Sequence, residues 1–176
     1  MLKIIGIAIV VAILGLLGFA ALQPDTYRVT RSITIKAPAE RVHAQVVDLK
    51  AWRPWSPWEK RDPAMKREFA GPASGKGATY AWEGNKDVGA GRMEILEVES
   101  PSRVLIQLTF LEPFESKARA EFTFKPQGEA TTVTWAMFGE ASFMTKLIGI
   151  FMSMDRMVGP DFEAGLAGLK TVTERP

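Results

Sequence analysis

The stretch MDRMVGPDFEAGLAGLK, residues 154 to 170, is where the chain changes from a pattern of strands to a pattern of helix. Its large apolar residues recur every three or four positions, which predicts a helix with one apolar face. The helical pattern runs from Ser142 to Val172, and Gly159-Pro160 inside it predicts a kink or a division. Gly165 and Gly168 each cost about 1 kcal/mol of helix stability relative to alanine. They indicate a helix that lies close against a sheet.

Strand patterns occupy most of the chain before this helix. They alternate in polarity with period two, or are apolar on both faces, as strands do. The seven segments are YRVTRSITIK (27–36), KREFAG (66–71), GATYAWEG (77–84), GRMEILEVES (91–100), RVLIQLTFL (103–111), SKARAEFTFKP (116–126) and TTVTWAMF (131–138). Short turns join most of them, which predicts a curved antiparallel meander. The apolar register shifts within residues 91–100, which indicates a bulge, and residues 103–111 are expected to be the central strand.

A helix is expected after the first strand, beginning at Ala37-Pro38, because Val42 and Val46 recur at helical spacing. His43 lies on this helix and is the only histidine, and the chain has no cysteine. A histidine-rich or thiolate metal site and a nucleophilic triad are therefore not supported. We expect His43 to be a partly buried structural residue. Arg31 falls on the apolar face of the first strand, either as a strand-end residue reaching solvent or as a charge at a cavity mouth.

The segment WRPWSPW, residues 52–58, contains three of the five tryptophans at intervals of three, with two prolines between them. This spacing suits polyproline II or a 3₁₀ turn, and both place the three rings along one edge. The rings could form a stacking platform for a ligand or a plug in the core. The plug is favoured, because each tryptophan can bury roughly 150–250 Å². A plug beside a cavity would also form part of its wall.

Residues 4–22, IIGIAIVVAILGLLGFAAL, contain no charged or polar side chain. As a helix the run would be about 28 Å long, close to the roughly 30 Å hydrocarbon core of a bilayer. We interpret residues 1–23 as a transmembrane anchor and residues 24–176 as one folded domain. A secretory signal peptide is the alternative, since Gly18-Phe19-Ala20 resembles a cleavage site, although the apolar run is longer than usual for one. The short positive N-terminus predicts a single-pass protein with its domain on the periplasmic side, whereas a count of the positive residues that follow the run (Arg28, Arg31, Lys36 and Arg41) would by itself keep the domain in the cytoplasm.

Composition excludes several classes of function. The net charge is +2, from 22 basic and 20 acidic residues without a basic run, so nucleic acid is not an expected partner. GPASGKGA (71–78) departs from the phosphate-loop spacing, and GAG (89–91) lacks the third glycine of a dinucleotide fingerprint. We therefore expect no cofactor, no metal and no assigned catalytic residue. The carboxylates are expected on a solvated face, and acid–base chemistry would require one of them to be buried.

The order of strand, helical pair, six strands and long helix resembles the START-like superfamily, also called SRPBCC or helix-grip proteins. The branch it is most similar to is the bacterial polyketide cyclase/dehydrase group. The stretches that carry the resemblance are RSITIKAPAERV (31–42), DLKAWRPWSPW (48–58), YAWEGNKDVGAGRMEI (80–95) and MDRMVGPDFEAGLAGLK (154–170). The resemblance implies an α+β helix-grip fold, with a hydrophobic cavity between the sheet and the C-terminal helix. It implies no particular reaction.

Three functions are compatible with these observations. The leading hypothesis is a membrane-anchored module that holds a hydrophobic small molecule or lipid. The residues expected to line its cavity are Trp55, Tyr80, Trp82, Phe110, Phe122, Phe124, Trp135 and Met157. The second is a cyclase or dehydrase acting on a polyketide-like chain, for which Arg31 and Glu83 are the nearest polar candidates. The third is a domain whose groove holds a segment of another protein.

Overall fold

The strands form one seven-stranded antiparallel sheet in the computed structural model, which describes residues 1–175. The order in the sheet is β1-β7-β6-β5-β4-β3-β2, so β2 to β7 form a meander and β1 joins it beside β7. The strands are β1 (Thr26–Ile35), β2 (Lys66–Ala70), β3 (Thr79–Glu83), β4 (Ala90–Glu99), β5 (Arg103–Glu112), β6 (Ser116–Gln127) and β7 (Ala130–Glu140). The expected α+β helix-grip architecture is confirmed.

Two details of the strand predictions are also confirmed. β5 is the middle strand of the sheet, which explains why its sequence is apolar on both faces. The register between β4 and β5 shifts between Ile95 and Glu97, so β4 contains an irregularity where its apolar pattern changes side. An extra residue at such a point bends the strand and increases its twist.

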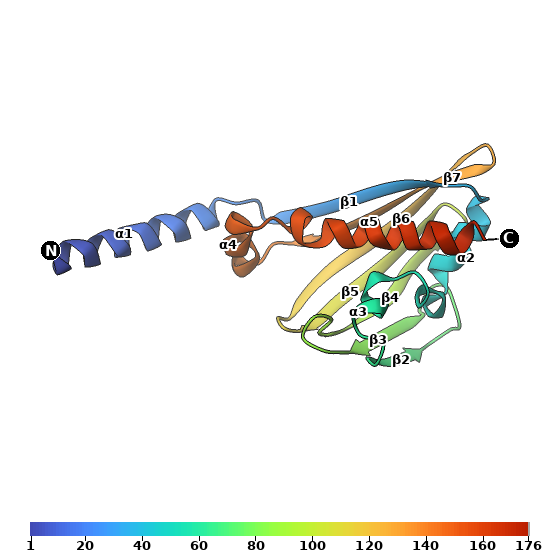
Figure 1. Ribbon diagram of the computed structural model, residues 1–176, viewed down its shortest axis with the longest axis horizontal. Helices are drawn as coiled ribbons and strands as arrows, with labels where there is room; N and C mark the ends of the chain where they lie inside the picture. Colours follow the sequence, from blue (N-terminus) through green and yellow to red (C-terminus); the bar gives the residue numbers. More distant parts are fainter. Residues whose placement is uncertain (176) are drawn as a thin grey trace.

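The C-terminal helical region consists of two helices, α4 (Phe143–Phe151) and α5 (Met154–Thr173). The division lies at Met152-Ser153, and Pro160, where we expected a kink or division, is inside α5. Met152 is extended, and the Ser153 hydroxyl accepts a hydrogen bond from the backbone N–H of Arg156. This cap begins α5 independently of α4. Figure 1 shows α5 lying along the sheet, while α4 lies apart from it near the N-terminal helix.

Glycines allow α5 to lie close to its neighbours, as the sequence predicted. A Cβ atom on Gly165 would lie 2.7 Å from the Trp135 ring of β7. One on Gly168 would lie 2.6 Å from the carbonyl oxygen of Trp55, which belongs to the tryptophan segment and not to the sheet. Both distances are shorter than a side chain tolerates. The helix is therefore fitted at these two points to a tryptophan ring and to a stretch of backbone.

Three short helices connect β1 to β2: α2 (Ala39–Val47), the 3₁₀-helix η1 (Leu49–Trp52) and α3 (Pro57–Arg61). α2 contacts β5, β6 and β7. His43 of α2 is buried, and its ring meets Phe124 edge-on with centroids 5.4 Å apart. Burial lowers the pKa of His43 below its usual value. The prediction that His43 is a structural residue agrees with this packing.

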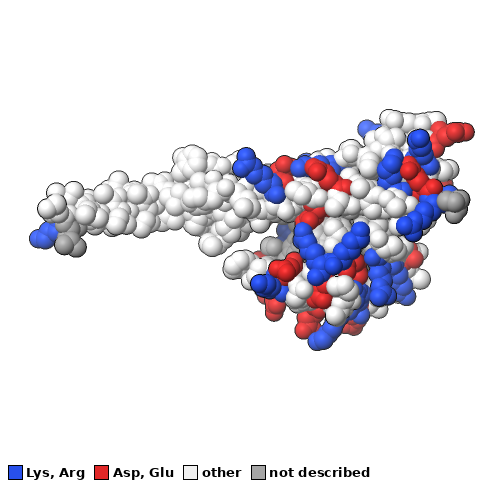
Figure 2. Space-filling model, viewed as in Figure 1, with Lys and Arg blue, Asp and Glu red and all other residues white. Residues whose placement is uncertain are grey.

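The first helix, α1 (Leu2–Ala21), projects away from the domain (Figure 1). Its segment Lys3–Ala21 is long and apolar enough to cross a membrane, with a mean hydropathy of 2.8. In Figure 2 charged side chains cover the domain, whereas the projecting helix is uncharged between its tip and the domain. Near its C-terminal end α1 contacts α4, and Ala20 there is completely buried.

Candidate functional site

A cavity of about 390 Å³ lies between the curved sheet and the helices α3, α4 and α5. Most of the side chains that line it are apolar. The sheet contributes Met93, Leu108 and Phe110, and the C-terminal helices contribute Ile148, Val158 and Phe162, among others. This volume lies within the roughly 300–1,000 Å³ typical of small-molecule sites.

The structure brings five of the eight predicted cavity residues into the lining: Tyr80, Trp82, Phe110, Trp135 and Met157. Trp55, Phe122 and Phe124 lie outside it, in the packed core, where each is at most 2% exposed. Phe122 and Phe124 do point to the helix-facing side of β6, as their alternation required. That half of the sheet, however, is covered by α2 and the tryptophan segment. Phe124 packs on His43, and Phe122 lies edge-on to Trp55 with centroids 6.4 Å apart.

The three rings of WRPWSPW have different surroundings. Trp52 and Trp58 line the cavity, whereas Trp55 is 1% exposed and lies in the core. The indole nitrogen of Trp52 donates a hydrogen bond to the Val46 carbonyl at 2.9 Å, which fixes the segment to α2. The 3₁₀-helix η1 ends at Trp52, a single turn closed by the Trp55 N–H on the Trp52 carbonyl at 3.0 Å follows, and α3 begins at Pro57, so neither of the two predicted conformations runs through the whole segment. The segment is therefore a plug at Trp55, and its two outer rings form part of the cavity wall.

Trp135 stands at the boundary between the cavity and the core. Its ring stacks on Phe162 of α5, with centroids 4.1 Å apart and planes 6° from parallel. On its other side it stacks on Phe122 at 4.7 Å, and Trp58 meets it edge-on at 5.9 Å. Stacked and edge-on aromatic pairs contribute about 0.5–1.5 kcal/mol beyond their buried area. This cluster gives the cavity a wall that is rigid on the side of the plug.

One charged group is buried in the cavity wall. Glu59 of α3 has a side chain that is only 7% exposed. Its carboxylate accepts a hydrogen bond from the Tyr80 hydroxyl at 2.9 Å and one from Nε of Arg67 at 2.8 Å. Burial raises the pKa of Tyr80 well above its usual value, and the hydrogen bond to Glu59 raises it further. Ser56, also buried, lines the cavity one turn away. The cavity thus has a buried polar cluster in a wall that is mostly apolar.

Sequence reasoning missed Glu59, because its partners come from elements that are distant in the chain. Arg67 lies on β2 and Tyr80 on β3, and only the fold places them against α3. The sequence contained one indication that Glu59 is buried. It directly follows the tryptophan segment, and a carboxylate exposed to water is unusual at such a place.

The polar residues predicted for an enzyme lie outside the cavity lining. Arg31 is on the helix-facing side of β1, where its guanidinium binds Asp155 at 2.7 Å and Glu163 at 2.6 Å, both on α5. A Cβ on Gly159 would collide with this guanidinium. Glu83 is exposed on β3 and pairs with Lys66 at 3.2 Å. Arg31 therefore joins β1 to α5, and Glu83 belongs to the outer surface.

Among residues 1–175 no group of three or more His, Asp or Glu side chains is placed to hold a metal ion.

Solved structures with the same fold come from several bacteria. A hypothetical protein of Helicobacter pylori superposes with a TM-score of 0.65 at 11% identity, covering 89% of this chain and 92% of its own. A Mesorhizobium loti protein gives 0.60 at 16% identity, covering 85% and 98%. The di-domain ARO/CYC BexL of the BE-7585A biosynthetic pathway gives 0.60 at 16% identity, and the match covers 90% of this chain and 54% of BexL. Identities this low establish the fold alone.

A search of functionally curated proteins gave no match. The model of one family, described as polyketide cyclase / dehydrase and lipid transport, matches residues 26–174. That range begins at the first residue of β1 and ends just after α5, so it includes the whole sheet, the polar cluster and the cavity. The chain therefore belongs to the polyketide cyclase / dehydrase and lipid transport family.

Proposed function

We propose that this protein is a membrane-anchored module that binds a hydrophobic small molecule or lipid in the cavity between the sheet and the C-terminal helices. The observation that carries the proposal is the 390 Å³ cavity, whose lining is mostly apolar, with Glu59 buried in its wall and Glu112, Glu115, Glu140 and Asp161 also among its lining residues. A bound apolar molecule would be stabilised by about 25 cal/mol for each Å² of apolar surface removed from water. The family to which the chain belongs includes lipid transport in its description, which supports the same function.

The anchor in this proposal is α1, which crosses the membrane through residues 4–22 and leaves the domain on the periplasmic side. The length of α1 and its uninterrupted apolar residues after Lys3 support the anchor, and the short positive N-terminus supports the periplasmic side. Four residues separate the end of α1 from β1, and four residues span at most about 14 Å. The cavity is therefore held close to the bilayer, which is a source of lipid.

Ligand binding can be tested by native mass spectrometry of the detergent-extracted protein and by titration with a brominated long-chain alcohol. Bromine quenches tryptophan fluorescence on contact, and Trp52, Trp58, Trp82 and Trp135 all line the cavity. We expect a co-purifying apolar molecule and saturable quenching. Absence of both would overturn the proposal.

A matched pair of variants locates the bound molecule. Leu108 of β5 lines the cavity, and Thr109, the next residue, does not. Leu108→Trp should fill the cavity and weaken binding, while Thr109→Trp should leave binding unchanged. Equal affinities for the two variants would place the ligand somewhere else.

A second candidate is a cyclase or dehydrase reaction, which the Glu59–Tyr80 pair favours. A buried carboxylate beside a phenol in an apolar cavity is an arrangement that can transfer protons to and from a substrate. The ARO/CYC description of BexL, a protein of similar fold, points to the same class of reaction. The test is incubation with a synthetic poly-β-ketone thioester and detection of cyclised or dehydrated product by mass spectrometry. Activity that depends on Glu59, lost in Glu59→Gln at unchanged substrate affinity, would establish the enzyme; no product at all would exclude it for this substrate class.

A further inference from the structure

Exposed apolar side chains surround the mouth of the cavity at the end of the domain nearest α1. We call this surface the rim patch, and its main members are Phe114, Met144, Ile148, Phe151, Met152 and Met157. They are between 40% and 73% exposed. All of them except Phe151 also line the cavity. The apolar interior therefore continues to the outside through side chains that have no covering partner in the described part of the chain.

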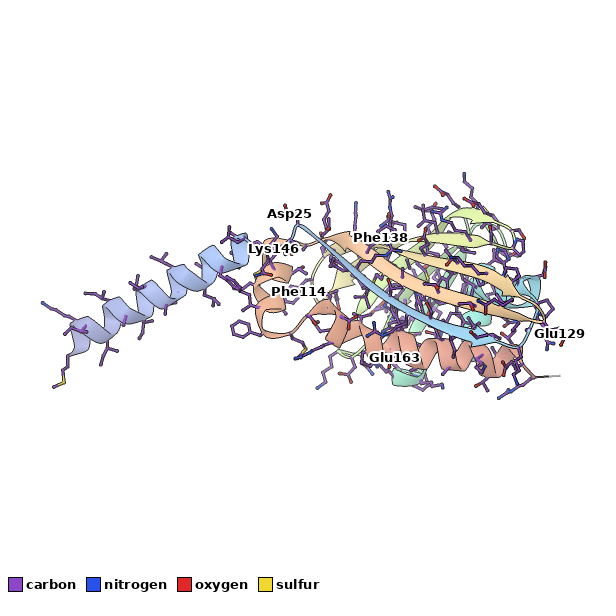
Figure 3. All side chains as sticks on the ribbon, turned by 90° about the horizontal axis from the view of Figure 1, so that it is seen from above. Asp25, Phe114, Glu129, Phe138, Lys146 and Glu163 are labelled. Atoms are coloured by element: carbon purple, nitrogen blue, oxygen red, sulfur yellow. The ribbon has the colours of Figure 1, made fainter. Side chains whose placement is uncertain are left out.

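The rim patch is fixed to the end of α1 by short-range contacts. α4, which carries most of the patch, contacts the C-terminal end of α1 around the buried Ala20. The backbone N–H of Ala141 donates to the carbonyl of Asp25 at 2.7 Å, and Nζ of Lys146 binds the Asp25 carboxylate at 2.5 Å. Figure 3 shows Asp25 and Lys146 side by side at the junction between α1 and the domain. α4 thus lies where α1 ends.

The composition of α4 suits the boundary between lipid and water. Its one charged residue is Lys146, whose ammonium group forms a salt bridge with Asp25 in the segment between α1 and β1. None of its residues is buried in the protein. Interfacial helices bury their large apolar side chains at the boundary between headgroups and acyl chains, and the exposed Phe143, Met144, Ile148 and Phe151 of α4 are suited to the same burial. Phe114 extends the patch from the turn between β5 and β6, and Glu112 and Glu115 flank it, so only the tip of that turn is apolar.

We propose that the rim patch is inserted in the bilayer, so that the cavity opens into lipid and its ligand enters without passing through water. The partner is a lipid surface, because the patch continues the apolar surface of α1 and is held at the level where a spanning helix leaves the hydrocarbon. The portal role rests on the proposed ligand-binding function. The insertion itself is a separate statement and can be tested alone.

The absence of cysteine from the chain allows insertion to be measured at single positions. Nitroxide labels on Phe114→Cys, Phe151→Cys and Glu129→Cys are compared in the full-length protein reconstituted in phosphatidylcholine nanodiscs. Glu129, in the turn between β6 and β7, is the control, since it lies at the opposite end of the domain (Figure 3). Labels at 114 and 151 should be accessible to lipid-dissolved oxygen and shielded from a water-soluble nickel complex, with the reverse at 129. Nickel accessibility equal to that of position 129 would overturn the proposal. Shielding found only in native membranes would also overturn it, by indicating a protein partner.

The portal role is tested by the rate at which a brominated long-chain alcohol moves from vesicles to the cavity. Phe151→Glu places a carboxylate in the rim patch at a position that does not line the cavity, and it should slow this transfer by about tenfold, because a charge in hydrocarbon is costly. Gln127→Glu adds the same charge at an exposed position far from the patch and should leave the rate unchanged. Equilibrium binding of the alcohol in detergent should be the same in both variants. An unchanged rate in Phe151→Glu would refute the portal.

Failure of the inference and failure of the proposed function give different results. If the cavity takes up no alcohol even in detergent, the proposed function fails, and the nitroxide labels still report whether the rim patch is inserted. If the alcohol binds in detergent and the labels at 114 and 151 are in water, the ligand-binding proposal stands and the membrane portal is wrong.

Discussion

Trp55 and Trp58 differ in what they contact, although they are three residues apart. Trp55 is 1% exposed and closes the core between β6 and α5, whereas Trp58 lines the cavity. Trp55→Ala should lower the free energy of unfolding by about 3–5 kcal/mol, the usual cost of removing a buried tryptophan. Thermal or denaturant unfolding in detergent measures this.

Trp58→Ala is the matched comparison for Trp55→Ala. It should cost less stability and weaken binding of the cavity ligand, because the half-buried ring forms part of the wall. If Trp55→Ala instead lost ligand binding at unchanged stability, the assignment of Trp55 to the plug would be mistaken.

His43 should make stability depend on pH near neutrality. Burial lowers the pKa of the folded-state imidazole below the value of 6.5 that it has when exposed. As the pH falls below about 6.5, the unfolded chain takes up the proton first, so stability present above that pH is lost as the pH falls toward the folded-state pKa. The melting temperature should therefore decrease from pH 7 to pH 5.

His43→Leu should remove this part of the pH dependence. The carboxylates of Asp155 and Glu97 also have lowered pKa values, held down by Arg31 and Arg103. They titrate in a more acidic range, so they do not mask the effect of His43. Identical pH dependence in the variant and the parent protein would show that His43 is not responsible.

At the scale of elements, the glycines of α5 show how closely this helix packs against the residues beside it. Gly168→Ala gains up to about 1 kcal/mol of helix propensity. It also places a methyl group 2.6 Å from the carbonyl oxygen of Trp55, a backbone atom that cannot rotate away. We expect a net loss of stability. Gly149→Ala in α4 is the control, because a Cβ there meets nothing within 4 Å and should be neutral or stabilising. Unfolding temperatures of the two variants test this, and a stabilised Gly168→Ala would show that α5 has room to move.

The elements themselves could be predicted from the sequence, since the period of the apolar residues distinguishes strand from helix. Even the irregularity in β4 was visible as a change of register. Gly159-Pro160, where local helix propensity is weakest, predicts a kink or a division of the C-terminal helix, but the division does not lie there. It lies at Met152-Ser153, because Ser153 caps α5 and α4 turns toward α1. The start of α5 depends on a single capping serine, and this residue stands out little among the apolar methionines and phenylalanines around it.

The site could be predicted less completely than the fold. Alternation along a strand shows which face a side chain occupies, and six of the eight cavity candidates lie on predicted strands; Trp55 belongs to the tryptophan segment and Met157 to the C-terminal helix. Alternation does not show which part of that face is covered. α2 and the tryptophan segment cover Phe122 and Phe124, so these two rings are in the core. Phe110 and Trp82 are not covered by them and line the cavity. Glu59 needed three elements to come together, and no local pattern contains that information.

At the scale of the whole molecule, the side of the membrane on which the domain lies is open to direct test. The short, positively charged N-terminus favours retention of that end in the cytoplasm. We therefore expect protease added to spheroplasts to digest the domain. Survival of the domain in intact spheroplasts, with digestion only after lysis, would place it in the cytoplasm. With either result the rim patch lies on the same side of the membrane as the domain, because contacts of Asp25 with Ala141 and Lys146 hold α4 at the end of α1.

The pairing of β1 with β7 has a consequence for biogenesis. Thr26 pairs with Glu140 and Ile35 with Thr131, so the first strand made is completed only by the last. If α1 enters the membrane early, β1 remains an unpaired edge beside the bilayer until the chain has been made as far as β7. Contacts this distant in sequence form slowly, because a long loop must close first. The pairing of β1 with β7 is therefore a late event in synthesis. Before it occurs, the nascent domain is most exposed to aggregation and most in need of a chaperone.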